Sequence, residues 1–233
     1  MAINELMAFV KGVHENSVLN QEWEVPFWNS TFEDPAKCAK RGLKQGDLGP
    51  ASYGPVLHDF PKRDGGSFNQ IRAVVQQINE LPHLKTHVAT TLYPPEIFRG
   101  KGLVQKVVTV PCHGTVIYFV VLNGKLHMTM VQRSGDLLPG VPHNKIQYAA
   151  LFLAVGQVTG YTPGIFSHTI LNPHIYENQV EHIKEIIRRE PISFPTVYIK
   201  DSSIKDIELF RKEHFALEDY HPHPAMKDIP VAT

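Results

Sequence analysis

The sequence predicts one α+β domain, in which a mixed β-sheet is flanked by helices. Two strand-like runs, 115–122 and 126–133, are joined by Asn123-Gly124, which is a strong hairpin signal. Residues 146–159 are apolar on nearly every side, as is typical of a buried helix. No internal repeat or low-complexity linker divides the 233 residues, so we expect a single domain over 1–233.

The first half of the chain predicts two helices and little else that is regular. Residues 3–10 have the i, i+3, i+4, i+7 apolar spacing of a helix, and 67–81 repeat it before Leu81-Pro82. We expect 13–50 to be irregular, turns over 46–55, and a short strand over 88–92. The scattered aromatic side chains of 13–50 either pack as a satellite core or line a flat ligand: Trp23, Phe27, Trp28 and Phe32.

The second half supplies most of the predicted sheet. We expect a loop over 94–102, a strand over 106–110 that is broken at Pro111, and then the central hairpin. A loop over 139–142 leads into the buried helix. Further along we expect a strand at 166–171, an amphipathic helix at 175–189, a strand at 196–200 and a proline-rich tail from 220.

Charge and cysteine content exclude several classes of protein. Lys+Arg and Asp+Glu both total 23, so the formal net charge is zero, whereas nucleic-acid or anionic-membrane binding needs a basic excess. We find no segment with the length of a transmembrane helix and no signal-peptide pattern. Cys38 and Cys112 do not form a disulfide framework, so we expect a reducing cytoplasm, and no metal site.

Cys112 is the first candidate for chemistry. It follows Pro111 at a break in a strand, with His113 beside it and Arg133 on the next strand. A thiolate is the reactive form of cysteine, and nearby positive charge favours it. A packed structural thiol is the more common role of a lone cysteine in apolar surroundings, so these residues alone leave both interpretations open. Glu5 is equally open, since an exposed helix carboxylate is the commoner case.

Five motifs in order carry a resemblance that settles the choice. With them the sequence resembles the folate-dependent thymidylate synthase family, including its pyrimidine nucleotide hydroxymethylase branch, from about Ile3 almost to the last residue. The motifs are Gly46-Asp47-Leu48-Gly49-Pro50 with Tyr53-Gly54; Pro111-Cys112-His113; Gln132-Arg133-Ser134-x-Asp136 with Gly140-x-Pro142-x-Asn144; His174-x-Tyr176-x-Asn178; and Tyr220-x-Pro222-His223-Pro224.

The resemblance implies a nucleophilic mechanism. Cys112 would add to C6 of a uracil ring, after which C5 would attack the methylene carbon of 5,10-methylenetetrahydrofolate. Glu5 would organise water for proton transfer at C5 and O4. Hydride from the folate would finish the reaction as a methyl group, and water would finish it as a hydroxymethyl group. The implied catalytic residues are Cys112, Glu5, Arg133, Asn144 and Tyr53.

The resemblance also implies where the two substrates bind. Asn144 would read uracil, because its amide can pair with both O4 and N3–H, whereas a cytosine-specific relative is expected to carry Asp there. A dUMP-type nucleotide would be held by Gln132, Arg133, Ser134, Asp136, Asn144, His174, Tyr176 and Lys85. The folate co-substrate would be held by Phe27, Trp28, Asp136, Pro139, Gly140 and Ala232.

Several positions depart from the family pattern. Lys85-Thr86 stands where the family has paired arginines for the phosphate of the dimer partner, and His143 replaces an aromatic residue beside Asn144. Pro139, Asn172 and Thr233 are further departures. We expect a homodimer that packs sheet face to sheet face, with Lys85 acting in the partner's site. Thymidylate synthesis is favoured, pyrimidine nucleotide 5-hydroxymethylation is the close alternative, and a non-catalytic nucleotide- or RNA-binding relative is the third.

Overall fold

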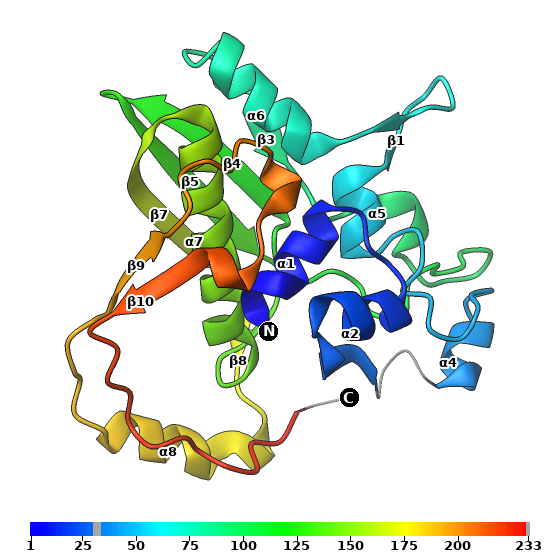
Figure 1. Cartoon of the computed structure of the whole chain (residues 1–233). Coiled ribbons are helices and arrows are strands. Elements are labelled where there is room, and N and C mark those ends of the chain that lie inside the picture. The colour runs from blue at the N-terminus through cyan, green and yellow to red at the C-terminus, as the bar shows by residue number, and fades with distance from the viewer. Residues whose placement is uncertain (30–33, 232–233) are drawn as a thin grey trace.

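The computed structural model describes residues 1–29 and 34–231 and contains a mixed β-sheet packed against helices, as predicted (Figure 1). Phe32, Ala232 and Thr233 lie outside the described residues. The strand order is β3-β4-β5-β7, with β5 and β7 parallel and the other neighbours antiparallel. The strands are β3 (Val88–Ala89), β4 (Val116–Leu122), β5 (Lys125–Gln132) and β7 (Thr162–Ile170).

Side chains alternate between the two faces of this sheet. In β5, Leu126, Met128 and Met130 are buried, and the residues between them are only half-buried. Helix α7 (Gly140–Thr159) covers the buried face and ends at Gly160, whose φ of 73° is left-handed (Figure 1). Helix α1 (Ala2–Val10) packs against α7, so the N-terminus of the chain reaches the centre of the molecule.

The predicted hairpin is confirmed. Asn123 and Gly124 both have positive φ, 50° and 73°, which is the backbone of the tight turn that this dipeptide favours.

Gly114, just before β4, is needed for a different reason. A Cβ there would lie 2.1 Å from Tyr148 Oη, so only glycine lets α7 approach this close to the start of the strand.

The first half of the chain is more helical than predicted. Short helical segments lie within the described residues of 13–58, and three of them hold Pro26, Pro35 or Pro55 in a first helical turn, where proline is tolerated. Two of the segments, η1 and α5, supply residues of the site described below. The segments are α2 (Asn16–Trp23), η1 (Pro26–Trp28), α4 (Pro35–Ala39) and α5 (Tyr53–His58).

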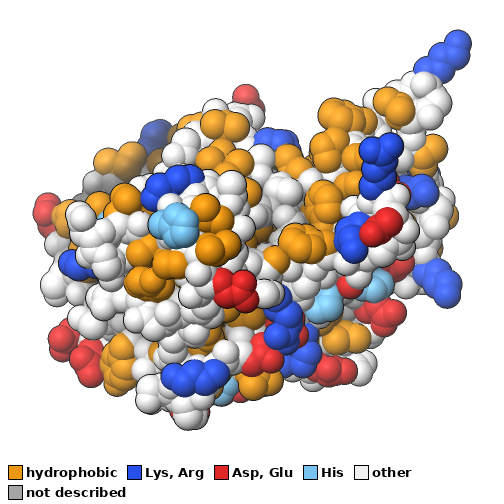
Figure 2. Space-filling view, turned by 90° about the horizontal axis from the view of Figure 1, so that it is seen from above, with side chains coloured by type: hydrophobic (Ala, Val, Ile, Leu, Met, Phe, Trp, Pro, Cys, Tyr) orange, Lys and Arg blue, Asp and Glu red, His pale blue; other side chains and the backbone are white. Residues whose placement is uncertain are grey.

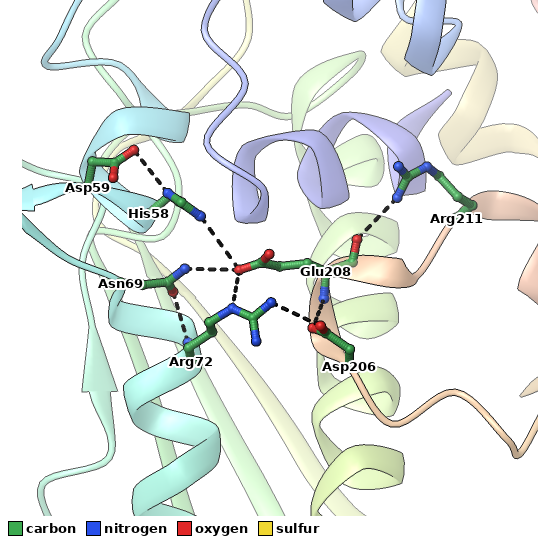
Figure 3. Close-up of polar contacts among 7 residues, drawn as sticks. All are labelled: His58, Asp59, Asn69, Arg72, Asp206, Glu208 and Arg211. Atoms are coloured by element: carbon green, nitrogen blue, oxygen red, sulfur yellow. Dashed lines mark hydrogen bonds and ion pairs between the residues drawn. The ribbon is translucent and has the colours of Figure 1, made fainter.

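Helix α6 (Gln70–Glu80) is tied to the C-terminal half by a polar cluster (Figure 3). Its N-cap Asn69 accepts from the backbone of Arg72 (3.0 Å), and both side chains bind the carboxylate of Glu208. Arg72 also reaches Asp206 at 3.0 Å. Because Asp206 and Glu208 lie at η4 (Ile207–Leu209), the cluster joins elements that are more than 130 residues apart in sequence.

Helix α8 and the C-terminal tail run along the lower edge of the molecule in Figure 1. Helix α8 (Val180–Arg188) follows η3 (Glu177–Gln179), and the tail lies along it, held by Arg189 on the carbonyl of Pro224 (2.9 Å) and by His223 on that of Glu190 (2.8 Å). The other elements are β1 (Phe60–Pro61), β2 (Ser67–Phe68), η2 (Pro94–Glu96), β6 (Gly135–Asp136), β8 (Pro173–His174), β9 (Thr196–Ile199), η5 (Lys212–His214) and β10 (Phe215–Glu218).

Two predicted elements are wrong. Residues 106–110 are not a strand, because their backbone bonds go to separate loops: Lys106 donates to Glu96 (2.9 Å) and Val108 to Leu48 (3.3 Å). Residues 140–142 are not a loop but the first turn of α7, which accepts Pro142 because the first N–H groups of a helix have no intrahelical partner. The helix therefore starts close to the predicted signature block.

Surface charge agrees with the balanced composition. In the view of Figure 2, basic and acidic side chains are interspersed with hydrophobic ones instead of gathering into one basic surface. Within residues 1–29 and 34–231, no helix combines the length and apolar character that a bilayer crossing requires.

Candidate functional site

Cys112 is held in place by contacts with two residues, Tyr53 and Arg133. Its N–H donates to Tyr53 Oη of α5 (2.8 Å), and the same hydroxyl lies 3.5 Å from Sγ. Its carbonyl accepts from the backbone N–H of Arg133 (2.7 Å), at the end of β5. These contacts bring together three of the predicted catalytic residues, Cys112, Tyr53 and Arg133, from separate parts of the chain.

The electrostatic environment of the thiol differs from the prediction. Burial raises the pKa of Cys112, and the hydrogen bond from Tyr53 and the charge of Arg133 only partly oppose this effect. Arg133 therefore acts on the thiol pKa in the predicted direction, and burial, which the prediction did not include, has the larger and opposite effect. The Arg133 guanidinium is exposed and makes only long contacts, 3.4 and 3.5 Å, with the carbonyl of Pro111, so it keeps donors for a ligand.

His113 has a structural role and does not activate the thiol. Its ring is buried, stacks on Tyr53 at 4.3 Å between centroids, and shares a 3.0 Å hydrogen bond with Tyr148 Oη. Burial lowers the pKa of His113 to about 3, so the ring is neutral at physiological pH. A neutral ring that faces two tyrosines contributes no positive charge to Cys112.

Glu5 is a buried carboxylate, not the exposed helix residue that its position alone suggests. Its side chain is only 3% exposed and accepts hydrogen bonds from three side chains, which lie on two elements. Trp28 Nε1 of η1 donates to Oε1 (2.5 Å). His143 Nε2 (2.8 Å) and Gln147 Nε2 (2.5 Å), one turn apart on α7, both reach Oε2.

A chain of amides continues from Glu5 toward β5. Gln147 Oε1 accepts from Asn144 Nδ2 (3.0 Å), and Asn144 Oδ1 accepts from Gln132 Nε2 (2.8 Å). Gln132 Oε1 is bonded in turn to His168 Nε2 of β7 (2.8 Å), and burial lowers the pKa of that histidine. The network fixes the orientation of the Asn144 amide, so that a ligand would meet a defined donor and acceptor.

Asp136 joins the site to the tail. Its Oδ2 accepts from Gln179 Nε2 (2.8 Å), and the same amide nitrogen donates to the carbonyl of Pro230 (3.0 Å). Oδ1 caps the backbone of Leu138 (3.1 Å). Asp136 also pairs in β-register with His174 in the β6–β8 ladder, so the His174 motif is held beside the signature block.

The other residues predicted to bind the nucleotide make fewer contacts with the groups described above. His174 meets Tyr176 edge to face at 5.3 Å, and Tyr176 is 41% exposed. Ser134 donates its N–H to the carbonyl of Cys112 (3.4 Å), while Lys85 is exposed between α6 and β3. Ala232 lies outside the described residues.

The predicted folate residues lie at the start of α7 and on η1. Phe27 stacks on His143 at 6.1 Å with an interplanar angle of 23°, and Pro139 is the N-cap of α7. A Cβ on Gly140 would lie in ordinary van der Waals contact with Asp136 Cβ at 3.7 Å and Asn144 Oδ1 at 3.9 Å, so the start of α7 lies close to both polar side chains.

Sequence reasoning missed the partner residues. Gln147, Gln179 and His168 orient Glu5, Asp136 and Gln132, and none of them belongs to a quoted motif. Gln147 lies three residues after Asn144 and four after His143 on α7, but the predicted helix began only at 146, so this shared face was not recognised. The other two depend on contacts that the chain pattern does not indicate.

Two hollows elsewhere are not lined by Cys112, Arg133 or Asn144. One of about 800 Å³ lies between the start of α2 and the loop 42–47, and one of about 490 Å³ lies between α6 and η4. Among the described residues, no three His, Cys, Asp or Glu side chains gather in a way that could hold a metal ion.

The arrangement combines a buried nucleophile with a carboxylate whose charge acts on it. Besides burial, the negative charge of Glu5 contributes to the raised pKa of Cys112, which places the two groups within electrostatic reach. Thiol, carboxylate, fixed amide and free guanidinium together suit covalent addition to a polar, anionic ring compound. A comparison of the sequence with protein families agrees: the family model described as "Thymidylate synthase" matches residues 1–232.

Proposed function

Because the chain belongs to the thymidylate synthase family, we propose that it transfers a one-carbon unit from 5,10-methylenetetrahydrofolate to C5 of a uridylate, dUMP in the first place. The observation that carries this proposal is the proximity of two reactive groups. Cys112 is held between Tyr53 and Arg133, and the charge of Glu5 acts on its thiol. A nucleophile and a proton-transfer group beside one ring are what C5 substitution needs.

The chain's own residues suit the successive steps of that reaction. Cys112 adds to C6, and the electron density gained at C5 forms the bond to the methylene carbon. Tyr53 stabilises the thiolate by its hydroxyl, which compensates part of the effect of burial on the pKa of Cys112. Glu5, acting through a water molecule, receives the proton that leaves C5.

The proposed nucleotide contacts follow from donors and acceptors. Asn144 is held by Gln132 and Gln147, so its remaining amide valences face uracil O4 and N3–H. Arg133 and Ser134 lie at the Cys112 carbonyl, and the exposed guanidinium of Arg133 suits a phosphate. His174 and Tyr176 form an edge that suits the sugar hydroxyl.

The residues proposed to hold the folate suit its pterin, which is a flat ring with an amide edge. Asp136 lies next to Gly140, and its carboxylate can accept from a pterin N–H. Phe27 and Trp28 supply an aromatic wall next to Glu5, and Pro139 begins the adjoining helix. When bound, this co-substrate supplies the one-carbon unit and, for a methyl product, the hydride.

The methyl product is our first proposal, and hydroxymethylation is the second candidate. His143 favours the latter, because its polar ring lies against Phe27 where an apolar wall would exclude water better. The two outcomes differ by one oxygen atom in the product. Mass spectrometry of the product formed from dUMP and methylenetetrahydrofolate separates them: gain of CH2 supports synthesis of thymidylate, and gain of CH2O supports the hydroxymethylase.

Dimerisation is part of the proposal. The half-buried face of the sheet, with Tyr118, Thr129 and Val131 on neighbouring strands, is not the face that α7 covers. We propose that a second copy packs on it and that Lys85 serves the partner's phosphate site. We further propose one catalytic domain over 1–233 and a cytoplasmic location, which suits two free thiols.

The decisive experiment is covalent capture. 5-Fluoro-dUMP with methylenetetrahydrofolate should form an adduct of one nucleotide on Cys112, because fluorine cannot leave C5 as a proton does. The adduct should be lost in Cys112→Ser and kept in Cys38→Ser. If the wild-type protein forms no adduct, the catalytic proposal is wrong and a non-catalytic nucleotide-binding role takes its place.

A further inference from the structure

We propose that His143 is a positioning residue for proton removal at C5: its Nε2–H holds the Glu5 carboxylate in the orientation that receives the proton. This inference rests on the proposed function, and it assigns a role to a residue that none of the quoted motifs assigns. Glu5 does the chemistry, and His143 acts through Glu5. The argument comes from the contacts, the burial and the packing of the imidazole ring.

The Glu5 carboxylate needs donors because it is buried. A carboxylate that is only 3% exposed is costly unless hydrogen bonds replace the lost water. Its three donors come from Trp28, His143 and Gln147. Of these three side chains, His143 is the one whose ring can exist either as a neutral donor or as a cation, and it donates to Glu5 in both forms.

The direction of the His143 bond is fixed by chemistry. An ionised carboxylate only accepts, so Nε2 carries the hydrogen in both the neutral ring and the imidazolium. Gln147, one turn further along α7, reaches the same oxygen at 2.5 Å. Trp28 meets the other oxygen, so the three donors together fix both the position and the rotation of the carboxylate.

The packing of His143 explains why this nitrogen points at Glu5. The ring stacks on Phe27 at 6.1 Å, which restricts its rotation, and its side chain is 22% exposed. A phenyl ring at this position would keep the stack and lose the N–H. A glutamine would place an amide N–H three bonds from Cβ, as far along the side chain as Nε2, and lose the ring. These two substitutions therefore separate hydrogen bonding from packing.

In the step that Glu5 serves, the C5–H bond breaks and its electron pair becomes the new exocyclic double bond. At the same time, the bond between the methylene carbon and the folate nitrogen breaks, and its electrons stay on the nitrogen. The proton passes through water toward Glu5. Without the His143 donor the carboxylate loses one charged hydrogen bond, and we expect proton removal to slow about 10- to 100-fold.

The test uses dUMP labelled with tritium at C5, because release of tritium to water reports this step whichever product forms. His143→Phe should release tritium about 10- to 100-fold more slowly, with the KM for dUMP and the capture of 5-fluoro-dUMP close to those of the wild type. His143→Gln should recover most of the rate. His14→Phe is the control, because His14 also pairs with a carboxylate, Asp47, at 3.2 Å and lies outside the site.

The outcomes are distinct. Wild-type tritium release by His143→Phe would mean that His143 only packs, and a rate for His143→Gln as low as that for His143→Phe would mean that the donor is not what matters; either result overturns the inference. If His143→Phe does not fold by circular dichroism, His143→Asn replaces it, since its amide is one bond too short to reach Glu5. Absence of the adduct in the wild type would overturn the proposed function and this inference with it.

Discussion

Replacing Tyr53 with Phe removes a hydroxyl that contacts both the backbone N–H and the sulfur atom of Cys112. Tyr53 Oη accepts the Cys112 N–H at 2.8 Å and lies 3.5 Å from Sγ. A hydrogen bond to a charged group contributes about 1.5–3 kcal/mol, and the long sulfur contact argues for the lower end. Since one pKa unit corresponds to about 1.4 kcal/mol, the pKa of Cys112 should rise by about one unit, and the thiolate fraction at neutral pH should fall about tenfold.

The same change affects stability. The Cys112 N–H loses its partner in a largely enclosed site, which should lower the free energy of unfolding by about 1–3 kcal/mol. The thiol pKa is already raised in the folded state, so folding disfavours the thiolate, and stability falls as pH rises above the ordinary cysteine pKa. In Tyr53→Phe the fall in the free energy of unfolding with rising pH should continue to a higher pH than in the wild type.

The assay is alkylation by iodoacetamide, followed by peptide mass spectrometry over a range of pH. Cys38 is fully buried and serves as the internal reference for unfolding. The midpoint for Cys112 should move up by about one pH unit in Tyr53→Phe and stay in place in Tyr198→Phe, whose ring is on β9. A midpoint that is unchanged or lower would refute the assignment of Tyr53 as a stabiliser of the thiolate.

Three further predictions test other parts of the fold and the site. Glu208→Gln should lower the free energy of unfolding by about 1–2 kcal/mol in chemical denaturation, against Glu218→Gln as control. Because the hydrogen bond from Arg72 lowers the pKa of Glu208, this difference should be present above the ordinary carboxyl pKa and shrink as pH falls through the lowered one. The ring of His113 should show no NMR titration from pH 8 to about pH 5, since its pKa is about 3; a midpoint near 6.5 would contradict its burial. Gln179→Ala should speed protease cleavage in the tail after 219, because Pro230 loses its anchor; an unchanged rate would argue against that role.

The sequence predicted the elements whose pattern is local. The Asn123-Gly124 hairpin and the apolar helix of 146–159 were found because turn chemistry and periodicity lie within one segment. Helix α5 was missed because Gly54-Pro55 is typical of a turn. Gly54 is there because a Cβ would lie 2.2 Å from the carbonyl of Val13, which is a contact between distant segments.

The site divides in the same way. The motifs named residues that the fold brings together, Cys112, Tyr53 and Arg133, because a family resemblance acts residue by residue. The net rise in the pKa of Cys112 was not predicted, because burial is a property of the fold and not of neighbours in sequence. The position of His113 beside Cys112 suggested that it acts on the thiol. Adjacent residues in an extended segment point to opposite sides, and the His113 ring bonds to Tyr148 instead.

The packing of α1 against α7 at the centre of the molecule bears on the order in which the chain can assemble. α1 carries Glu5, and its neighbour Asn4 accepts a hydrogen bond from the backbone of Lys212 at 2.8 Å, across 208 residues. At about 5–20 residues per second, a ribosome needs on the order of 10–40 s to make that stretch. During this time α1 can pack on α2, α5 and α7, but its contact with Lys212 cannot form. Recovery of activity after dilution from denaturant should therefore track the slowest, most long-range part of folding and not local helix formation.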